Sequence, residues 1–529
     1  MARAPTGTTA ARRRRRATGA NAPANPPPAA PSLVPATLRL YCHGLGDCML
    51  VSLPADHADR PFRILIDCGV HSAVRAGPRR VDAMLTDLAR ACDRRLDVIV
   101  GTHEHWDHLS GFLTARDRFV DADAPGLAAD DPRIRVGEIW LAWTENPEDP
   151  EARALDRYKD EAEATLLGLR LAIESADDVG GMGLDATAAG LDSLFGFVFG
   201  ARGERVRSAR EALRTLVPES RVRYLEPGTL APLPSQVTGF RAHVLGPPRD
   251  ARLLRIHDSP TDGYKLAFGN HPETLALASA LAIVNGHLDL RDDPASPFDP
   301  TEGVSLADLR DGRLRDEQQR LSAFLDTHYL RDDPHRRIDN QWMAGAAELA
   351  LQLDRNTNNT SLVLAFERIE TGDVLLFAAD AQAGNWQSWQ DVEIALGPSA
   401  DAGTRTGPDL LSRTIFYKVG HHGSGNATLR ERGLERMDGR RLVAFNPTDA
   451  DLAGRLGWRN FPAQALVQAL EARTSGRYIQ SDAGWILGGD AAPFAADGAL
   501  AAPPRTGAVK AARIDGQDLM IGWVEIDIV

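Results

Sequence analysis

Asp97–Gly111 reads DVIVGTHEHWDHLSG, and this stretch decides how the rest of the chain is interpreted. Its apolar run, Val98–Val100, is short, rich in β-branched residues and stopped by Gly101, which predicts a buried strand. Four potential metal ligands follow directly, namely His103, His105, Asp107 and His108. Imidazole and carboxylate groups together suit zinc, and less exclusively iron or manganese. The stretch therefore predicts a metal-binding loop at the end of a buried strand.

The spacing of these ligands also indicates how many ions the loop can hold. Alternation along an extended chain places His103 and His105 on the same side, facing one ion. A turn at Trp106 would then direct Asp107 and His108 toward a second ion. Two metals roughly 3.5–4 Å apart form the usual clamp of metal-dependent hydrolases. A single histidine would fit a solvated loop equally well, but the complete H-x-H-x-D-H spacing behind a buried strand favours a metal site.

The composition is that of a soluble globular protein with an acidic body. The chain has 529 residues, enough for a large core and about two to four domains. The formal net charge is −13, and because the first 37 residues contain six Arg and no acid, the remainder carries −19. Phosphate contacts along a duplex need clustered Lys and Arg, so this charge disfavours duplex binding. It leaves room for an anionic small molecule or a single-stranded nucleic acid held by metal ions.

The cysteines and the N-terminal residues bear on location. The four cysteines lack C-x-x-C spacing, which favours small buried side chains in a reducing cytosol; they are Cys42, Cys48, Cys68 and Cys92. Residues 1–36 are rich in Ala, Pro and Arg and predict a disordered basic tail. No apolar segment follows Arg12–Arg16 as an export signal requires, and no run approaches the ~20 residues of a membrane span. A cytoplasmic protein without a membrane span is expected.

Residues 37–144 predict the first half of a layered α/β fold. The expected strands are Thr37–Tyr41, Cys48–Leu53, Phe62–Ile66 and Ile134–Trp143, and the expected helices are Val81–Ala91 and Leu109–Phe119. A G-x-G-D turn at Gly44–Asp47 joins the first two strands. This order places residues 103–108, called the ligand loop below, at the ends of strands.

The middle of the chain departs from this pattern twice. Residues 145–234 have helical periodicity around a Gly-rich connection and predict a helical insertion. Residues 235–248 return to the sheet, and residues 249–355 form a second insertion, able to serve as a lid or as a surface for a protein partner. The elements expected here are helices at Asp149–Ser175, Arg202–Leu216, Pro272–Val284 and Leu314–Leu325, and a strand at Val237–Val244.

Residues 356–529 predict the second half of the fold. The expected strands are Ser361–Glu367, Val374–Ala379, Ile415–Val419, Leu442–Phe445, Tyr478–Ile479 and Leu519–Ile528, with a helix at Pro462–Ala472. Asp380 follows the second of these strands, and His421 and His422 follow the third. Strand ends bring distant residues together, so these side chains are expected to converge with the ligand loop. There Asp380 would bridge two cations and reduce their mutual repulsion.

His421 and His422 are predicted to have different roles, because adjacent residues on an extended chain point in opposite directions. One would coordinate a metal, and the other would hydrogen-bond or protonate the substrate. Its position next to the strand end slightly favours His421 as the ligand, and the reverse assignment stays open. The Gly-Ser-Gly that follows lets backbone N–H groups approach an oxyanion.

Taken together, these motifs resemble the metallo-β-lactamase fold superfamily, and within it the soluble hydrolase module of ComEC-type competence proteins and their stand-alone relatives. The similarity rests on Gly44–Asp47, ILIDCG, THEHWDH, NNTSLVL, VLLFAAD and YKVGHHGS. It implies a four-layer αββα sandwich carrying the two insertions. It also implies a dinuclear site held by His103, His105, Asp107, His108, Asp380 and His421 or His422, with Asp47 and Asp67 fixing the ligand histidines.

The chain departs from this family in three respects. Ala379 stands where a glycine usually precedes the bridging aspartate. A histidine typical of a third superfamily motif has no clear counterpart, and the candidates by position are His243, His271, His287 and His328. The membrane channel of the competence proteins is absent, so the resemblance does not extend to DNA uptake.

The expected function is a metal-dependent hydrolase, foremost a phosphodiesterase or nuclease that uses a hydroxide activated by two zinc ions, with Mn²⁺ or Fe²⁺ as alternatives. Asp107 would orient or deprotonate the water, and the non-ligating member of His421 and His422 would protonate the leaving group. The same site would support hydrolysis of a lactone or β-lactam, since fold does not fix substrate. The remaining alternative is a metal-stabilised interaction protein whose insertions bind a partner.

Overall fold

The computed structural model describes residues 34–56, 58–160, 204–259, 261–263, 323–324, 327–328, 355–456, 458, 461–483, 506–514 and 521–528. The expected basic tail lies outside these residues up to position 33, and so do the Gly-rich connection of the first insertion and the helix Pro272–Val284. Of the expected helix Leu314–Leu325, only residues 323–324 are described.

The first sheet contains nine strands among the described residues. They are β1 (Ala36–Cys42), β2 (Cys48–Leu53), β3 (Phe62–Cys68), β4 (Arg95–Val100), β5 (Phe119–Asp121), β6 (Ile134–Ala142), β7 (Val222–Leu225), β17 (Thr506–Arg513) and β18 (Gly522–Ile528). Their order is β17-β18-β1-β2-β3-β4-β6-β5, with β7 also paired to β6. The strands from β17 to β3 are antiparallel, whereas β3, β4 and β6 run parallel. The ligand loop follows β4 at the carboxyl edge of this parallel part.

The second sheet contains seven strands among the described residues, in the order β16-β15-β14-β11-β10-β9-β8. They are β8 (Leu230–Ala231), β9 (Phe240–Gly246), β10 (Val363–Arg368), β11 (Val374–Phe377), β14 (Thr414–Lys418), β15 (Val443–Asn446) and β16 (Tyr478–Gln480). A separate short pair joins β12 (Glu393–Ala395) and β13 (Thr404–Thr406). Because β11, β14 and β15 run parallel, their carboxyl ends meet at one edge and carry Asp380 and the histidine pair there.

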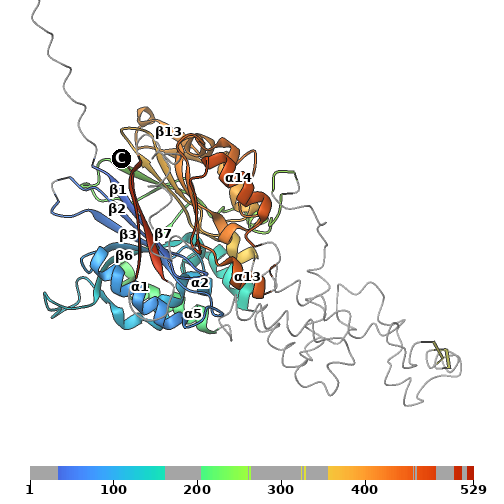
Figure 1. The fold of residues 1–529 in the computed structure, drawn as a ribbon, viewed down its shortest axis with the longest axis horizontal. Helices are drawn as coiled ribbons and strands as arrows, with labels where there is room; N and C mark the ends of the chain where they lie inside the picture. Colours follow the sequence, from blue (N-terminus) through green and yellow to red (C-terminus); the bar gives the residue numbers. More distant parts are fainter. Residues whose placement is uncertain are drawn as a thin grey trace, which may run out of the picture. The chain divides into compact units, whose positions relative to one another are not determined.

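The two sheets face each other across a shared apolar core, and helices cover their outer faces (Figure 1). On the first sheet these are α1 (Gly77–Ala91), α2 (Trp106–Thr114) and α5 (Glu204–Arg214). On the second they are α11 (Ala383–Ser388), α12 (Gly407–Ser412) and α14 (Gln464–Thr474). Two shorter helices are α6 (Ala251–Leu254) and α13 (Ala450–Arg455). The architecture is therefore mixed α/β.

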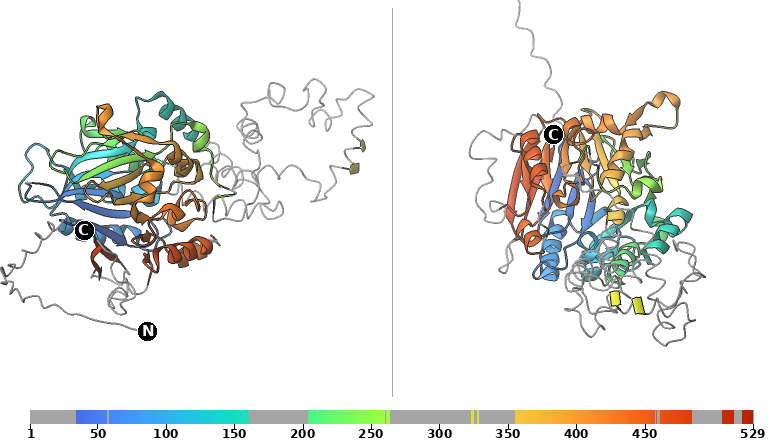
Figure 2. Two further views of the ribbon diagram at one scale, coloured as in Figure 1. Left: turned by 90° about the horizontal axis from the view of Figure 1, so that it is seen from above. Right: turned by 90° about the vertical axis from the view of Figure 1, so that its right-hand side faces the viewer.

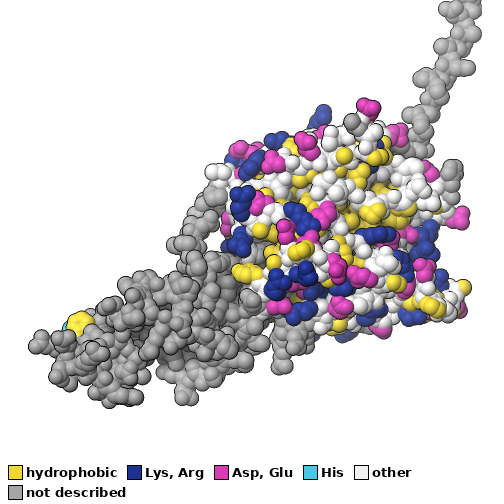
Figure 3. All heavy atoms as spheres, turned by 180° about the vertical axis from the view of Figure 1, so that it is seen from behind, with side chains coloured by type: hydrophobic (Ala, Val, Ile, Leu, Met, Phe, Trp, Pro, Cys, Tyr) yellow, Lys and Arg dark blue, Asp and Glu magenta, His cyan; other side chains and the backbone are white. Residues whose placement is uncertain are grey.

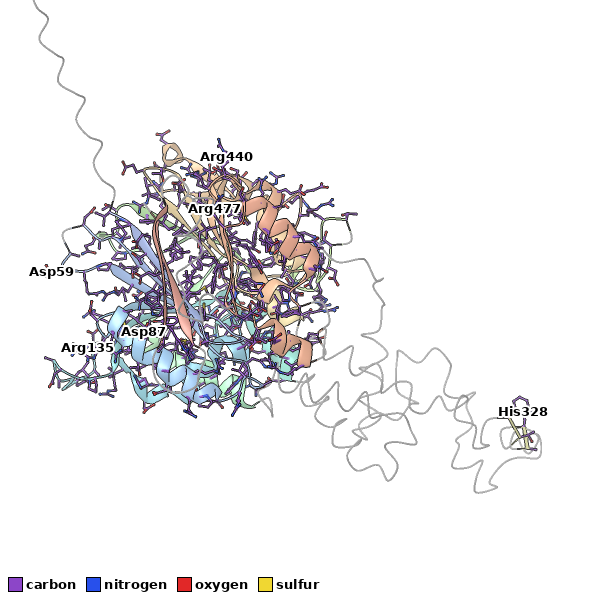
Figure 4. The ribbon with its side chains drawn as sticks, in the orientation of Figure 1. Asp59, Asp87, Arg135, His328, Arg440 and Arg477 are labelled. Atoms are coloured by element: carbon purple, nitrogen blue, oxygen red, sulfur yellow. The ribbon has the colours of Figure 1, made fainter. Side chains whose placement is uncertain are left out.

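The N-terminal strand β1 is held on both sides, by α1 and by β18. Asp87 on α1, labelled in Figure 4, accepts hydrogen bonds from Tyr41 Oη and from Arg39 Nη1, both at 2.8 Å. The Arg39 guanidinium also bonds Glu525 of β18 at 2.7 Å and lies 4.0 Å from the ring centroid of Trp523. Figure 2 shows the C-terminal strands, drawn in red, beside the blue N-terminal strands.

The strands expected from the sequence are confirmed, with shifts of a few residues at their ends, and β2 has the expected bounds. The helix expected at Leu109–Phe119 instead starts at Trp106, because Asp107 and His108 form its first turn. It stops at Thr114, and Phe119 begins β5. The sequence did not predict β17, whose alanines, glycine and charged residues give little alternation.

The expected extent of the first insertion, residues 145–234, is wrong in its last part. The helix α5 packs against α2, and Val206, Ala209 and Leu213 share a core with Phe112. The strand β7 then pairs with β6 of the first sheet, and β8 pairs with β9 of the second. These strands are too short to show periodicity, and their pairing decides their conformation. Residues 204–231 therefore belong to the core.

The expectations about the cysteines, membrane spans and surface charge can be compared with the described residues. All four cysteines are buried and free, as the absence of paired spacing predicted. No helix in the described part of the chain is long and apolar enough to cross a membrane. On the face shown in Figure 3, acidic and basic side chains are interspersed.

Glu367 of β10 is a buried carboxylate surrounded by basic groups. Its oxygens accept hydrogen bonds from Arg405 Nε and Arg413 Nη1, each at 2.8 Å, and from His243 Nε2 at 2.9 Å. Burial alone would raise the pKa of this carboxyl, but the hydrogen bonds from His243, Arg413 and Arg405 hold it below its usual value.

The variant Glu367→Gln is expected to lose roughly 3 kcal/mol of unfolding free energy at pH 7. This value is at the lower end of the usual cost of breaking a buried ion pair, because both arginines keep contact with water. A depressed folded-state pKa gives stability that is present above the unfolded pKa of about 4.3 and is lost as the pH falls. The difference from wild type should therefore shrink below about pH 4. Urea unfolding across pH measures it, with the exposed Glu370→Gln as control. A difference that does not change with pH would contradict this role.

Candidate metal centre

The junction between β4 and α2 places the four ligands of the H-x-H-x-D-H motif. His103 and His105 lie in the loop, with Nε2 of the first and Nδ1 of the second 3.1 Å apart. Asp107 and His108 lie in the first turn of α2, where the helix N-terminus favours a carboxylate. All four side chains are exposed by no more than 2 %. The loop therefore brings the four predicted ligands together in a buried position.

Glycine and backbone contacts fix the turn that holds Asp107. A Cβ at Gly69, in the ILIDCG motif, would lie 2.2 Å from the carbonyl of Asp107, so a side chain there would displace the turn. The backbone N–H of Asp47 donates to the carbonyl oxygen of Asp107 at 3.1 Å, and Gly69 N–H donates to Asp47 O at 3.0 Å. Two motifs that are separate in sequence thus pack directly on the ligand loop.

Asp67 orients two of the ligand histidines from behind. Its Oδ2 accepts a hydrogen bond from His108 Nδ1 at 2.7 Å and another from Thr102 Oγ1 at 2.7 Å. Thr102 Oγ1 in turn lies 3.0 Å from His103 Nδ1. Because the Nδ1 atoms of both rings are engaged, their Nε2 atoms are left to face the centre. This arrangement agrees with the supporting role that the family resemblance implied for Asp67.

Asp380, three residues after the end of β11, enters the same cluster from the second sheet. Its Oδ2 lies 3.2 Å from His108 Nε2 and 4.0 Å from His103 Nε2. Its Oδ1 points the other way and accepts hydrogen bonds from His421 N and Lys418 Nζ, each at 3.1 Å. The two oxygens of this carboxylate therefore have different surroundings, and only Oδ2 faces the histidines of the loop.

His422 closes the cluster from the end of β14. Its Nε2 lies 2.8 Å from Asp107 Oδ2 and 3.7 Å from Asp380 Oδ2, and its Nδ1 donates to Pro447 O at 2.6 Å. His421 lies at the edge instead, exposed by 7 %, with its ring centroid 5.3 Å from that of Phe461. The geometry favours His422 as the ligand, the reverse of the slight preference drawn from the sequence.

The premise of an extended chain at this pair is wrong. His421 and His422 lie in a 3-10 turn, Gly420–Gly423, and both have positive φ, 44° and 51°. Left-handed backbone costs of order 1–3 kcal/mol for a non-glycine residue and persists where the surroundings impose it. Here the hydrogen bonds from His421 N to Ala379 O and Asp380 Oδ1 impose it.

Ala379 itself has a positive φ of 47°. This is a left-handed backbone, which glycine adopts more readily than alanine.

Burial and carboxylates divide the histidines into two kinds. Burial lowers the pKa of His105 to about 3 and that of His421 to about 4, and it also lowers that of His103. Burial likewise opposes a charge on His108 and His422, but Asp380 and the other aspartates outweigh it and raise the pKa of both rings. The carboxylates thus draw positive charge toward the centre of the cluster.

The centre presents donor atoms suited to a metal ion. Asp107 Oδ1 is buried and forms no hydrogen bond within the described residues, whereas His108 Nε2 and Asp380 Oδ2 face each other at 3.2 Å and have no other hydrogen-bond partner there. Two overlapping groups have ligand atoms within 4.8 Å of one another, namely His103, His108 and Asp380, and Asp47, His108 and His422. Nitrogen and oxygen donors of this kind fit zinc, and buried polar atoms without partners are otherwise costly. The described residues can therefore hold a metal ion here.

Sequence reasoning missed Lys418, the last residue of β14, which is fully buried beside Asp380. The available signal was a lysine closing an otherwise apolar strand, TIFYK. The family resemblance placed Asp47 behind the ligand histidines. In the structure, however, Asp47 Oδ2 lies 2.5 Å from Lys418 Nζ and farther, at 3.7 Å, from His108 Nδ1. Asp47 acts on the cluster chiefly through this lysine.

Of the four candidates for a third-motif histidine, the structure describes two, and neither belongs to the cluster. His243 is buried at the second sheet and bonds Glu367. His271 and His287 lie outside the described residues. His328, labelled in Figure 4, makes a ring contact with Phe324 at 4.7 Å between centroids.

Charged side chains of α5 and of the first insertion contact the ligand loop. Glu104, between the first two histidines, pairs with Arg210 of α5 at 3.2 Å and with Lys159 at 3.4 Å. Arg210 also bonds the buried carboxylate of Glu145 at 3.1 Å. Packing of the insertion thus bears on the position of the loop.

Comparison with known proteins adds no further constraint. No protein-family model matches the chain, and searches of curated proteins and of solved structures also found no match.

Proposed function

We propose that the chain is a metal-dependent hydrolase whose two sheets and outer helices form the metallo-β-lactamase sandwich. The observation that carries this proposal is the convergence of two distant motifs. His422 Nε2 lies 2.8 Å from Asp107 Oδ2, and Asp380 Oδ2 lies 3.2 Å from His108 Nε2, although the pairs come from opposite halves of the chain. Buried clusters of this composition, at strand ends, are typical of metal sites.

The ligand set divides between two cation positions. His103 and His105 would serve the first, and Asp107, His108 and His422 the second. Asp380 Oδ2 would be shared, since it approaches histidines of both groups. Zinc suits these donors, with Mn²⁺ or Fe²⁺ as alternatives.

Two bound cations supply electrophilic stabilisation and make water a competent nucleophile near neutral pH. The chain's own groups complete the site. Asp107 Oδ1 is placed to accept a hydrogen bond or a proton from the attacking water. His421, at the edge of the cluster and neutral in its buried position, suits hydrogen bonding to a substrate oxygen better than proton donation. This modifies the general-acid role first expected for the non-ligating histidine.

A phosphodiester, within an anionic small molecule or a single-stranded nucleic acid, is the preferred substrate class. Two cation positions favour it because in-line displacement at phosphorus develops charge on both the attacking and the leaving oxygen. Lactones and β-lactams are the second class, since the same donors would activate a carbonyl. A metal-stabilised interaction protein is the third candidate, supported by the ion pair between Lys159 of the first insertion and Glu104 of the ligand loop.

A substrate panel tests this order of preference. Bis-p-nitrophenyl phosphate, single-stranded DNA and RNA are expected to turn over before a lactone or nitrocefin when the protein is loaded with zinc. Asp107→Ala should abolish that turnover without unfolding the protein, and it serves as the control for a contaminating enzyme. Turnover of nitrocefin or the lactone with inert phosphodiesters would move the assignment to the second class. Inactivity on all five, with a partner recovered by pull-down, would favour the interaction protein.

A further inference from the structure

Lys418 is a charged side chain with no exposure to solvent, and its ammonium group is fully engaged. Nζ lies 2.5 Å from Asp47 Oδ2, 2.9 Å from Ala379 O and 3.1 Å from Asp380 Oδ1. Nζ donates hydrogen bonds to Ala379 O and Asp380 Oδ1 and forms an ion pair with Asp47 Oδ2. Because Lys418 is fully buried and held by these three groups, it is placed to position them and not to contact a substrate.

The three acceptors come from both halves of the fold. Asp47 follows the turn between β1 and β2 in the first sheet, whereas Ala379 and Asp380 follow β11 in the second. A buried ammonium is costly unless it is paired and hydrogen-bonded, which fixes where its partners lie. Lys418 thus joins the two sheets at the edge that carries the candidate metal ligands.

We propose that Lys418 is a positioning residue of the candidate metal centre. Its ammonium group orients the Asp380 carboxylate so that Oδ2 alone faces the metal positions. The proposal rests on the proposed function, because it concerns how the same centre is assembled. Lys418 and the backbone N–H of His421 engage Oδ1, and the Oδ2 atom that remains is the one near His103, His108 and His422.

The positive charge of Lys418 also helps to balance the negative charges of the candidate metal centre. This centre contains four buried aspartates, namely Asp47, Asp67, Asp107 and Asp380. A dinuclear centre of divalent ions neutralises four negative charges by itself, and Lys418 adds one more positive charge. The site is then able to hold a substrate or nucleophile of negative charge without a net negative interior.

The removal of Lys418 would change zinc affinity in opposite directions, depending on whether the lysine contributes only charge or positions Asp380. This difference makes the proposal testable. If the lysine only contributed charge, its loss would relieve repulsion and strengthen zinc binding. If it positions Asp380, its loss weakens zinc binding. The double variant Lys418→Met/Asp47→Asn removes one positive and one negative charge, so the net charge of the site is unchanged. Because Asp47 also lies near His108 and His422, comparison with Asp47→Asn alone isolates the positioning effect of Lys418.

Zinc titration of the metal-free full chain, in competition with a chromophoric chelator, measures this. The double variant is expected to bind zinc at least about tenfold more weakly than wild type, as supports of metal ligands usually do. Arg413→Met is the matched control, because it breaks an ion pair with Glu367 next to the opposite end of β14. It should lower thermal stability while zinc affinity stays at the wild-type value.

Lys418→Gln provides a second route if the double variant does not fold, since the amide keeps part of the hydrogen bonding without the charge. It too is expected to bind zinc more weakly than wild type. Wild-type affinity in whichever variant folds would overturn the role of Lys418 while leaving the metal centre intact. A wild-type chain that binds no zinc would instead overturn the proposed function, and this proposal with it.

Discussion

Replacing Asp380 by asparagine is expected to reduce bound zinc from about two ions per chain to one or none and to lower turnover at least about 100-fold. The carboxylate approaches histidines of both proposed cation positions through one oxygen, so its charge would serve both ions. An amide keeps the size and can still accept the hydrogen bonds of Lys418 and His421, but it no longer neutralises the cations. The loss should therefore appear in the metal content and not in the fold.

Elemental analysis of the purified variant, together with hydrolysis of bis-p-nitrophenyl phosphate, measures both effects. Asp373→Asn is the matched control, because Asp373 is a buried carboxylate at the other end of the same strand, where it pairs with Arg441. The control should keep two zinc ions and wild-type turnover, even if its melting temperature falls. Two zinc ions in Asp380→Asn, at unchanged affinity, would exclude a bridging role for this residue.

The histidine pair should give two different phenotypes. His422→Ala is expected to lose the ion held with Asp107 and His108, leaving about one zinc per chain, because His422 Nε2 lies within the cluster and Pro447 O fixes its ring. His421→Ala is expected to keep both ions and to lose about 10²–10³ in kcat, the usual effect of removing one donor to a developing charge. The two losses thus affect metal content and turnover separately.

Metal content and kcat measured on the same preparations test this assignment. Thr428→Ala serves as a control, since Thr428 is buried after the same turn and bonds Tyr417 Oη, which is not a candidate ligand. Equal loss of zinc from both histidine variants would contradict the division, and loss from His421→Ala alone would restore the assignment first drawn from the sequence.

Local patterns predicted most of the sheets, because buried parallel strands are short apolar runs such as Val98–Val100 and Val374–Phe377. The H-x-H-x-D-H spacing likewise identified the ligand loop. What local pattern did not predict depends on contacts between distant residues. The left-handed turn at His421 is imposed by Ala379 and Asp380, and the strand β7 exists through its pairing with β6.

Lys418 illustrates the same limit at the site. A lysine that ends an apolar strand normally reaches solvent, and here its burial depends on Asp47, which belongs to the other sheet. The supporting role of Asp67 was expected only from the family resemblance, and the structure adds Thr102 as the link by which Asp67 also reaches His103.

The pairing of β1 with β18 has a consequence for synthesis on the ribosome. β1 lies between β2 and β18, and all seven of its residues pair with the C-terminal strand. Until β18 emerges, the nascent chain carries an unpaired strand edge on β1, and such edges readily pair with other chains. Closure of the first sheet therefore waits until residues 522–528 have emerged, and chains truncated before residue 522 should aggregate and fail to retain zinc.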